Sequence, residues 1–94
     1  NASSEIDLAI LLDSTNLDFQ IMKAKIIAKT DNYEQAIKIL KGLESKNFKL
    51  DTVNFNIGSC YYGHGYQLLI KQGYIEKAKD SFEMSLNYFD NAIN

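Results

Sequence analysis

Cys60 and His64 are the two residues of this 94-residue chain whose types and spacing are suited to chemistry. They are four positions apart, which places their side chains next to each other on one face of a helix. A cysteine beside a histidine can act as a nucleophile or supply half of a metal site. An enzyme or metal protein that uses this pair is therefore one hypothesis.

Two observations argue against chemistry at this pair. The chain has one cysteine and one histidine, so no second residue of either kind can complete a zinc site. Nucleophilic catalysis also requires an oxyanion donor and a pocket, and the sequence contains no phosphate loop, no metal motif and no glycine-rich turn after a strand. We therefore expect no enzyme, no cofactor and no metal site.

Composition and charge exclude further classes of protein. Apolar residues make up 46% and charged residues 23% of the chain, which is ordinary for one soluble domain spanning residues 1–94. Seven lysines gather between positions 23 and 49, but the chain lacks arginine, which bidentate contacts to phosphate or guanine favour, so we expect no nucleic-acid partner. No apolar run approaches the ~18 residues of a membrane span, so we expect no membrane partner. The single cysteine fits a reducing compartment such as the cytoplasm and otherwise leaves the localisation open.

Helices must position these residues, because the chain has no proline and its apolar residues recur at helical spacing between short polar turns. We expect five helices, from Ser4 to Asp13, Leu17 to Lys29, Tyr33 to Lys46, Thr52 to Lys71, and Tyr74 to Ala92. The polar cluster that ends at Asn16 is expected to cap the second helix. Asp31 with Glu34 predicts a capping box for the third helix, and Asp51 or Thr52 is expected to cap the fourth.

The same spacing predicts which residues are buried. In the second and third helices these are Ile21, Ala24, Ile27, Ala28, Tyr33, Ala36, Ile37, Leu40 and Leu43, with Phe48 and Leu50 tucked into the next connection. In the last two helices they are Phe55, Ile57, Tyr61, Tyr62, Leu68, Leu69, Ile75, Ala78, Phe82, either Leu86 or Ser85, Phe89 and Ile93. Glycines at 58, 63 and 65 weaken the fourth helix by roughly 1 kcal/mol each relative to alanine, so a kink near 63–65 is the alternative to a continuous rod.

Two stretches of the chain repeat each other at a spacing of 34 residues. Ala24 and Ile27 of the first stretch align with Gly58 and Tyr61 of the second. Each stretch continues into a turn and an alanine, at Ala36 and at Ala78. A small residue, a large one three places on, a turn and an alanine form a packing pattern for paired helices, and this period indicates a helical repeat.

This pattern resembles the tetratricopeptide repeat, a family of stacked 34-residue helical hairpins with a small and a large residue in the first helix and alanine in the second. The resemblance implies an all-α fragment of a right-handed α-solenoid, built from stacked antiparallel helical hairpins. Residues 1–16 would form a partial repeat, 17–50 the first full repeat, and 51–94 an extended second repeat. It covers nearly the whole chain.

The sequence departs from the family pattern at several positions. Gln20 and Asn54 stand where a large aromatic residue is usual, and Phe48 stands where proline is usual. Ala36 and Ala78 are 42 residues apart instead of 34. The surplus of eight is close to two helical turns, or ~12 Å of rod, so we expect the last hairpin to project beyond its neighbour.

The resemblance implies a protein or peptide partner that binds along the concave face lined by the first helix of each hairpin. The residues expected to contact it are Ile21, Met22, Lys25, Lys29, Phe55, Asn56, Ser59 and Tyr62. For Ile21, Phe55 and Tyr62 the alternative is a place in the core between helices. The alternative function is structural self-association, as a homodimer through the long C-terminal hairpin, because Leu86, Phe89 and Ile93 lie near its end.

Overall fold

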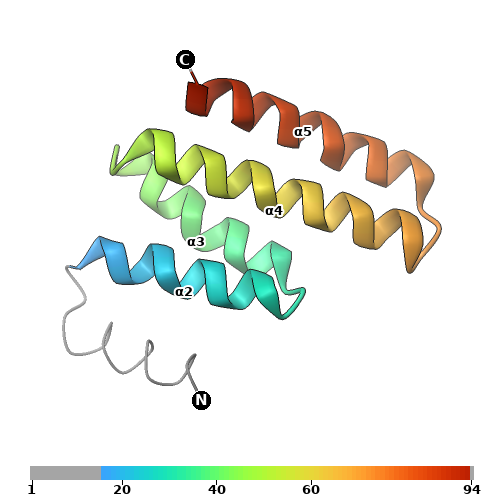
Figure 1. The fold of residues 1–94 in the computed structure, drawn as a ribbon, viewed down its shortest axis with the longest axis horizontal. Helices are drawn as coiled ribbons and strands as arrows, with labels where there is room; N and C mark the ends of the chain where they lie inside the picture. The colour runs from blue at the N-terminus through green and yellow to red at the C-terminus, as the bar shows by residue number, and fades with distance from the viewer. Residues whose placement is uncertain (1–15, 94) are drawn as a thin grey trace.

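A computed structural model describes residues 16–93 of the chain, and these residues form helices without any strand (Figure 1). The elements are α2 (Leu17–Lys29), α3 (Tyr33–Ser45), α4 (Leu50–Ile70) and α5 (Ile75–Ile93). The all-α prediction is therefore confirmed for this part of the chain. The helix expected from Ser4 to Asp13 lies outside the described residues.

The start of α2 follows the sequence prediction. Asn16 precedes the helix in an extended conformation, and its side-chain oxygen accepts a hydrogen bond of 3.1 Å from the backbone N–H of Asp18. This bond satisfies one of the N–H groups that a helix leaves unpaired at its first turn. At the other end, the Thr30 hydroxyl donates to the carbonyl of Ile27 at 2.7 Å.

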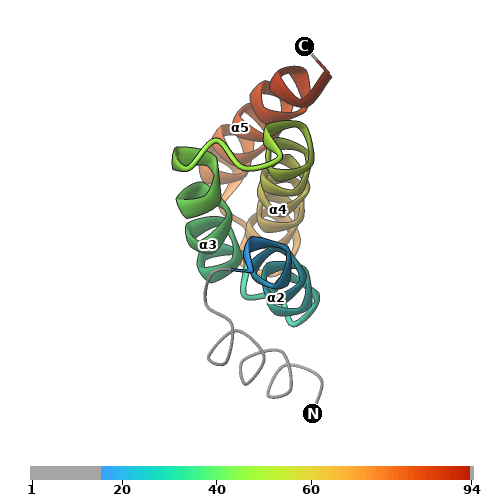
Figure 2. The same ribbon diagram turned by 90° about the vertical axis from the view of Figure 1, so that its left-hand side faces the viewer.

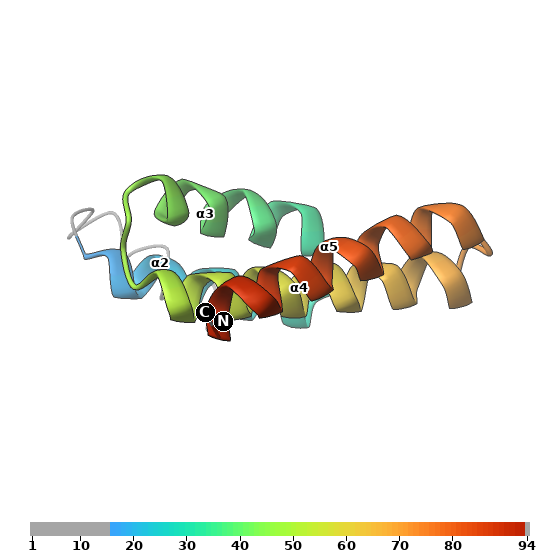
Figure 3. The same cartoon turned by 90° about the horizontal axis from the view of Figure 1, so that it is seen from above.

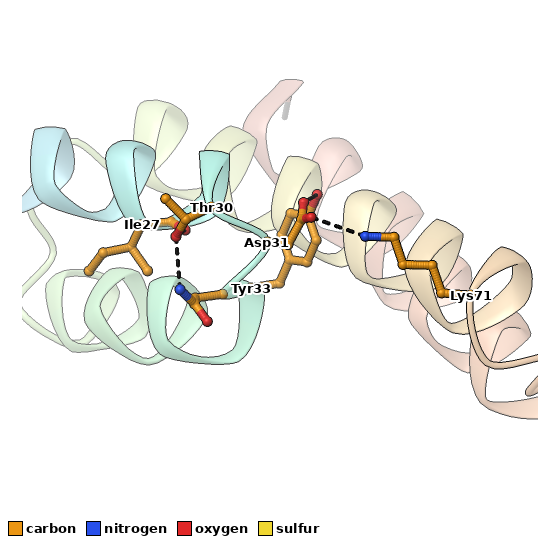
Figure 4. Close-up of polar contacts among 6 residues, drawn as sticks. Ile27, Thr30, Asp31, Tyr33 and Lys71 are labelled. Carbon is orange, nitrogen blue, oxygen red and sulfur yellow. Dashed lines mark hydrogen bonds and ion pairs between the residues drawn. The ribbon is translucent and has the colours of Figure 1, made fainter.

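The predicted capping box of α3 is wrong. Asn32 holds the capping position without a side-chain capping bond, and Asp31 adopts a left-handed φ of 65°. The Asp31 carboxylate instead accepts a hydrogen bond from the Tyr33 hydroxyl and pairs with the Lys71 ammonium, both at 3.2 Å (Figure 4). Lys71, followed by Tyr33, holds the pKa of Asp31 below its ordinary value of 3.8. These contacts tie the α2–α3 turn to the end of α4.

The start of α4 also differs from the prediction. The helix begins at Leu50, and Lys49 precedes it with a left-handed φ of 44°, so neither Asp51 nor Thr52 caps it. The reversal between α3 and α4 is tight, and its backbone conformation sets where the helix begins. Phe48 packs against the core as expected, whereas Leu50 is largely exposed.

The four helices form two antiparallel hairpins, α2–α3 and α4–α5, and α4 packs against α3 and α2 as well as against α5 (Figure 2). Most of the hydrophobic core lies between α2, α3 and the first half of α4. Its fully buried members include the alanines at 24 and 36, whose small side chains allow neighbouring backbones to approach. The larger core residues are Ile27, Ile37, Leu40, Leu43, Val53 and Ile57.

Two glycines of α4, Gly58 and Gly65, allow α5 to pack close to the α4 backbone. A Cβ atom on Gly58 would lie 2.7 Å from the Phe89 ring, and one on Gly65 would lie 2.8 Å from the Phe82 ring. The Ser85 hydroxyl donates a buried hydrogen bond of 2.8 Å to the carbonyl of Gly58. Aromatic rings of α5 therefore pack against these two glycines. The glycines do not break the helix, and α4 runs without interruption from Leu50 to Ile70 (Figure 1).

The last hairpin projects beyond the first. α4 has 21 residues and α2 has 13, so α4 carries the eight extra residues that the sequence predicts. Figure 3 shows the α4–α5 turn lying well past the α2–α3 turn. The Tyr33 ring at the start of α3 packs over Gly63, where an added Cβ would lie 2.6 Å from the ring. The remainder of α4 beyond this contact packs on α5.

The predicted buried faces of α4 and α5 are partly wrong. α4 turns Gly58 and Gly65 toward α5, and α5 packs its small residues Ala78, Ser81 and Ser85 against α4. Several larger apolar residues of both helices are therefore rotated outward. Ser85, the second of the two alternatives at that position, is the buried one. The residues expected in the core but largely exposed are Phe55, Tyr62, Leu69, Ile75, Leu86 and Ile93.

A pair of glycine substitutions tests the close approach of α4 and α5. Alanine is the better helix former by roughly 1 kcal/mol, so a glycine-to-alanine change in an open helix position stabilises the protein. Gly42 in α3 has nothing within 4 Å of an added Cβ, and Gly42→Ala should raise the free energy of unfolding by about 0.5–1 kcal/mol. Gly58→Ala should lower it by about 1–3 kcal/mol, because the Phe89 ring must move.

Urea unfolding followed by far-UV circular dichroism measures both changes. Equal stabilisation by Gly42→Ala and Gly58→Ala would show that the Phe89 ring does not depend on a bare backbone at position 58.

Candidate partner-binding face

The structure buries Cys60 in the core and places His64 beside Glu34 of α3. The Cys60 side chain is 5% exposed, and burial raises the pKa of its thiol from 9.0 to about 11. The thiol therefore stays protonated near neutral pH, where a nucleophile or a metal ligand must be a thiolate. His64 instead faces Glu34 of α3, with 3.8 Å between Nε2 and the carboxylate oxygen. Within residues 16–93, no three histidine, cysteine, aspartate or glutamate side chains are placed to hold a metal ion.

Two adjoining grooves lie along α2 and α4, on the face where the sequence predicted partner contacts. The first has a volume of about 640 Å³, and the side chains of Lys25, Phe55 and Asn56 line it. The second has a volume of about 220 Å³, and Lys25 and Asn56 line it together with Lys29 and Ser59. We call the two together the docking groove. Five of the eight predicted contact residues lie in it: Lys25, Lys29, Phe55, Asn56 and Ser59.

The other three predicted residues lie elsewhere. Ile21 is 6% exposed and belongs to the core, so this predicted contact is corrected: the residue is enclosed by its neighbours and cannot touch a partner. Met22 is exposed on α2 outside the groove. Tyr62 is exposed on α4, where its ring contacts the rings of Tyr66 and Phe82 at centroid distances of 6.1 and 5.6 Å.

The lysines of the docking groove differ from other lysines of the chain. Lys49 pairs with Asp18 at 2.7 Å and Lys71 pairs with Asp31 at 3.2 Å, which ties loops to helices. Lys25 and Lys29 have no such ion pair within residues 16–93. The Asn56 amide donates to the Thr52 carbonyl at 2.8 Å, which leaves its oxygen without a partner in the same part of the chain. The groove therefore offers two positive charges, one negative charge from Asp51 and an acceptor beside apolar walls.

The sequence did not predict that α5 contributes to the docking groove. Phe89, Ala92 and Ile93, near the end of α5, line the larger groove opposite Lys25. The Phe89 ring contacts the Phe55 ring at a centroid distance of 5.5 Å, which brings α5 to the groove wall. The sequence feature that could have indicated this wall is the apolar stripe of α5, whose spacing predicts burial in the core.

A third cleft, of about 700 Å³, lies where the long hairpin passes the α2–α3 turn. Tyr33 and Glu34 of the first hairpin line it, and His64, Tyr74 and Asp80 line it from the second. Its walls carry charges of both signs, since Lys77 also lies there with its ammonium 5.0 Å from the centre of the Tyr74 ring. The eight-residue surplus in the sequence predicts that the second hairpin extends past the first, which forms this cleft. It does not predict which residues line the cleft.

Comparison of the chain with models of known protein families, with curated proteins and with solved structures finds no match in any of the three. The helices described also include none with the length and apolar character needed to cross a membrane.

The raised pKa of Cys60 predicts slow alkylation of the native protein. At about pH 8, a thiol whose pKa is higher by two units has roughly 100-fold less thiolate, and burial also limits access. We expect native Cys60 to react with iodoacetamide at least about 100-fold more slowly than the same residue in urea, as measured by mass spectrometry. Equal rates would show an exposed, reactive thiol and restore the nucleophile hypothesis.

The same shift has a consequence for stability. The thiol pKa is higher in the folded chain than its ordinary value of 9.0, so its contribution is fully present below pH 9. The contribution is lost as the pH rises from 9 toward about 11, because the unfolded chain ionises first. Cys60→Ala should remove this part of the pH dependence, which urea unfolding between these pH values can measure.

Proposed function

We propose that this chain is a non-enzymatic protein-interaction module that binds a peptide or helix of a partner protein along the docking groove. The observation that carries the proposal is the exposure, along one face of α2 and α4, of large apolar side chains beside Lys25 and Lys29, which have no ion pair among residues 16–93. Contiguous apolar surface of this kind, edged by polar groups, is typical of interaction sites. Helical hairpins present such surfaces without supplying catalytic groups.

The packing of the helices supports a tetratricopeptide-like arrangement. Ala24 and Gly58, which the repeat aligns, are both buried, and so are Ala36 and Ala78. Each hairpin contacts the next through neighbouring helices: α3 packs on α4, and α2 also contacts α4. On this basis we propose a short right-handed solenoid, with repeats at 17–50 and 51–94 and a fifth helix from the partial repeat at 1–16.

The chemistry of the groove indicates what the partner segment contains. Phe55 and Phe89 provide an apolar wall on which a leucine-sized or aromatic anchor can be buried. Lys25 and Lys29 attract carboxylates, and the Asn56 oxygen can accept one hydrogen bond from the partner. We therefore propose a segment with apolar anchors flanked by acidic residues.

A peptide selection tests this proposal. A phage-displayed library of 20-residue peptides would be selected on the immobilised protein, and the best binder would be measured by fluorescence anisotropy. Lys25→Glu should weaken its binding about tenfold, because a positive charge in the groove becomes negative. Phe55→Ala should weaken it about tenfold through loss of an exposed aromatic wall of the groove.

The matched control is Lys38→Glu, the same charge change at an exposed position of α3, outside the three cavities described above. This variant should bind within about twofold of the wild type. If Lys25→Glu and Phe55→Ala both leave binding unchanged, the docking groove is not the binding site.

A further inference from the structure

Four exposed apolar residues of α4, together with Ser59, follow a heptad spacing. They lie alternately four and three positions apart on the side of the helix that points away from α3. Helices with apolar residues at this spacing pack lengthwise against another helix. The members of the stripe are Phe55, Ser59, Tyr62, Tyr66 and Leu69.

A second stripe with the same spacing runs along α5. Because α5 turns its small residues toward α4, the heptad positions remain on the outside, and three of them are at least 60% exposed. Lys79 is the one charged residue of this stripe. The members of this stripe are Ile75, Lys79, Phe82, Leu86, Phe89 and Ile93.

The two stripes form one surface, which we call the open face. The Phe55 ring contacts the Phe89 ring, and the Tyr62 ring contacts the Phe82 ring, at centroid distances of 5.5 and 5.6 Å. These contacts place both stripes on the same side of the hairpin. Two antiparallel helices with apolar heptad stripes on a common side are equivalent to half of a four-helix bundle.

We propose that a second copy of this chain covers the open face, so that two α4–α5 hairpins complete a four-helix bundle. The inference rests on the proposed function, since α5 of one copy is then the helix that lies along the docking groove of the other. A two-fold axis parallel to the helices sets α5 of each copy antiparallel to α4 of its partner. Leu86 of one copy then lies over the turn that contains Ser59 and Tyr62 of the other.

The area of the open face suits a dimer. Seven large side chains of the two stripes are between 41% and 82% exposed. With ~200 Å² for each full side chain, they expose about 800 Å². A stable interface buries a similar area on each partner, ~800 Å². A single helix lying between the stripes would leave the outer sides of both uncovered.

The charges around the open face also favour a second copy. The solvent edge of α5 carries three acidic residues at seven-residue spacing, Glu76, Glu83 and Asp90, and none of them has an ion pair within residues 16–93. From position 52 to 70, α4 has no aspartate, glutamate, lysine or arginine, so within α4 the acidic edge can meet a like charge only at Asp51, in the first turn. Repulsion between like charges therefore opposes this arrangement at one end of α4 at most.

The acidic edge of α5 then faces α2 of the partner. Within the described chain, α2 and α5 both pack on α4 but not on each other, so α5 of a second copy, placed over α4, is adjacent to α2. Lys25 shares its groove with Phe89 and Ile93, which places it near the level of the last turns of α5. In the antiparallel dimer, Asp90 of the second copy lies beside Lys25.

Sedimentation equilibrium of the full chain tests the dimer. The wild type should be a reversible dimer at micromolar to millimolar concentration. Leu86→Glu should weaken dimerisation at least roughly 100-fold, because the symmetric interface would bury two glutamates. Ile70→Glu is the matched control: Ile70 is 65% exposed and Leu86 is 64% exposed, but Ile70 lies outside both stripes, so this variant should dimerise like the wild type. Circular dichroism checks that both variants fold.

A charge exchange in trans tests the arrangement of the two copies. Lys25→Asp alone and Asp90→Lys alone should each weaken dimerisation about fivefold or more. An equimolar mixture of these two variants should form a heterodimer with wild-type affinity, since every 25–90 contact again joins opposite charges. A contact within one chain would not be restored by mixing.

Three results would overturn the inference: a strict monomer at millimolar concentration, a dimer that is insensitive to Leu86→Glu, or no recovery in the mixture. The peptide measurement above keeps the proposed function separate. If the wild type is monomeric but binds the selected peptide in the groove, the second copy is excluded and the proposed function stands. If the protein neither dimerises nor selects a peptide, both are excluded.

Discussion

The close approach of α5 to the bare backbone of α4 determines which surface this protein presents. Phe82 and Phe89 rest on Gly65 and Gly58, at distances that leave no space for a Cβ atom. To come this close, α5 must meet α4 with its smallest side chains, and Ser85 completes the contact with a hydrogen bond to Gly58. Ile75, Leu86 and Ile93 of α5 are then directed to the side, where they remain accessible. The exposed apolar face therefore follows from how the hairpin closes.

This constraint also explains which parts of the structure the sequence could predict. Residues such as Leu40 and Ile57 have large side chains at helical spacing, and their burial follows from that spacing alone. In α5, however, Leu86 and Ser85 are adjacent, and hydrophobicity favours the leucine. The buried one is the serine, whose hydroxyl donates a hydrogen bond to the Gly58 carbonyl of the neighbouring helix. Such a choice depends on a second helix and cannot be read from the stripe itself.

The helix boundaries show the same division between local and tertiary causes. Asn16 caps α2 through a bond to a residue two positions away, so its role could be predicted from the sequence. Asp31 was expected to cap α3 locally in the same way, but its carboxylate forms an ion pair with Lys71, which is forty positions later in the chain. The docking groove was predicted in its α2 and α4 parts. Its α5 wall was missed because Phe89 had been assigned to the core.

The limited size of the chain gives the exposed face an energetic role. A small domain buries a smaller fraction of its apolar surface than a large one, so the hairpins depend on stacking for much of their stability. The first hairpin covers one side of α4, and the eight-residue extension carries α4 beyond that cover. A partner docked on the remaining side would lie against Phe82 and Phe89, the rings that cover the two glycines. By mass action, a partner that binds only the folded chain would stabilise the closed hairpin.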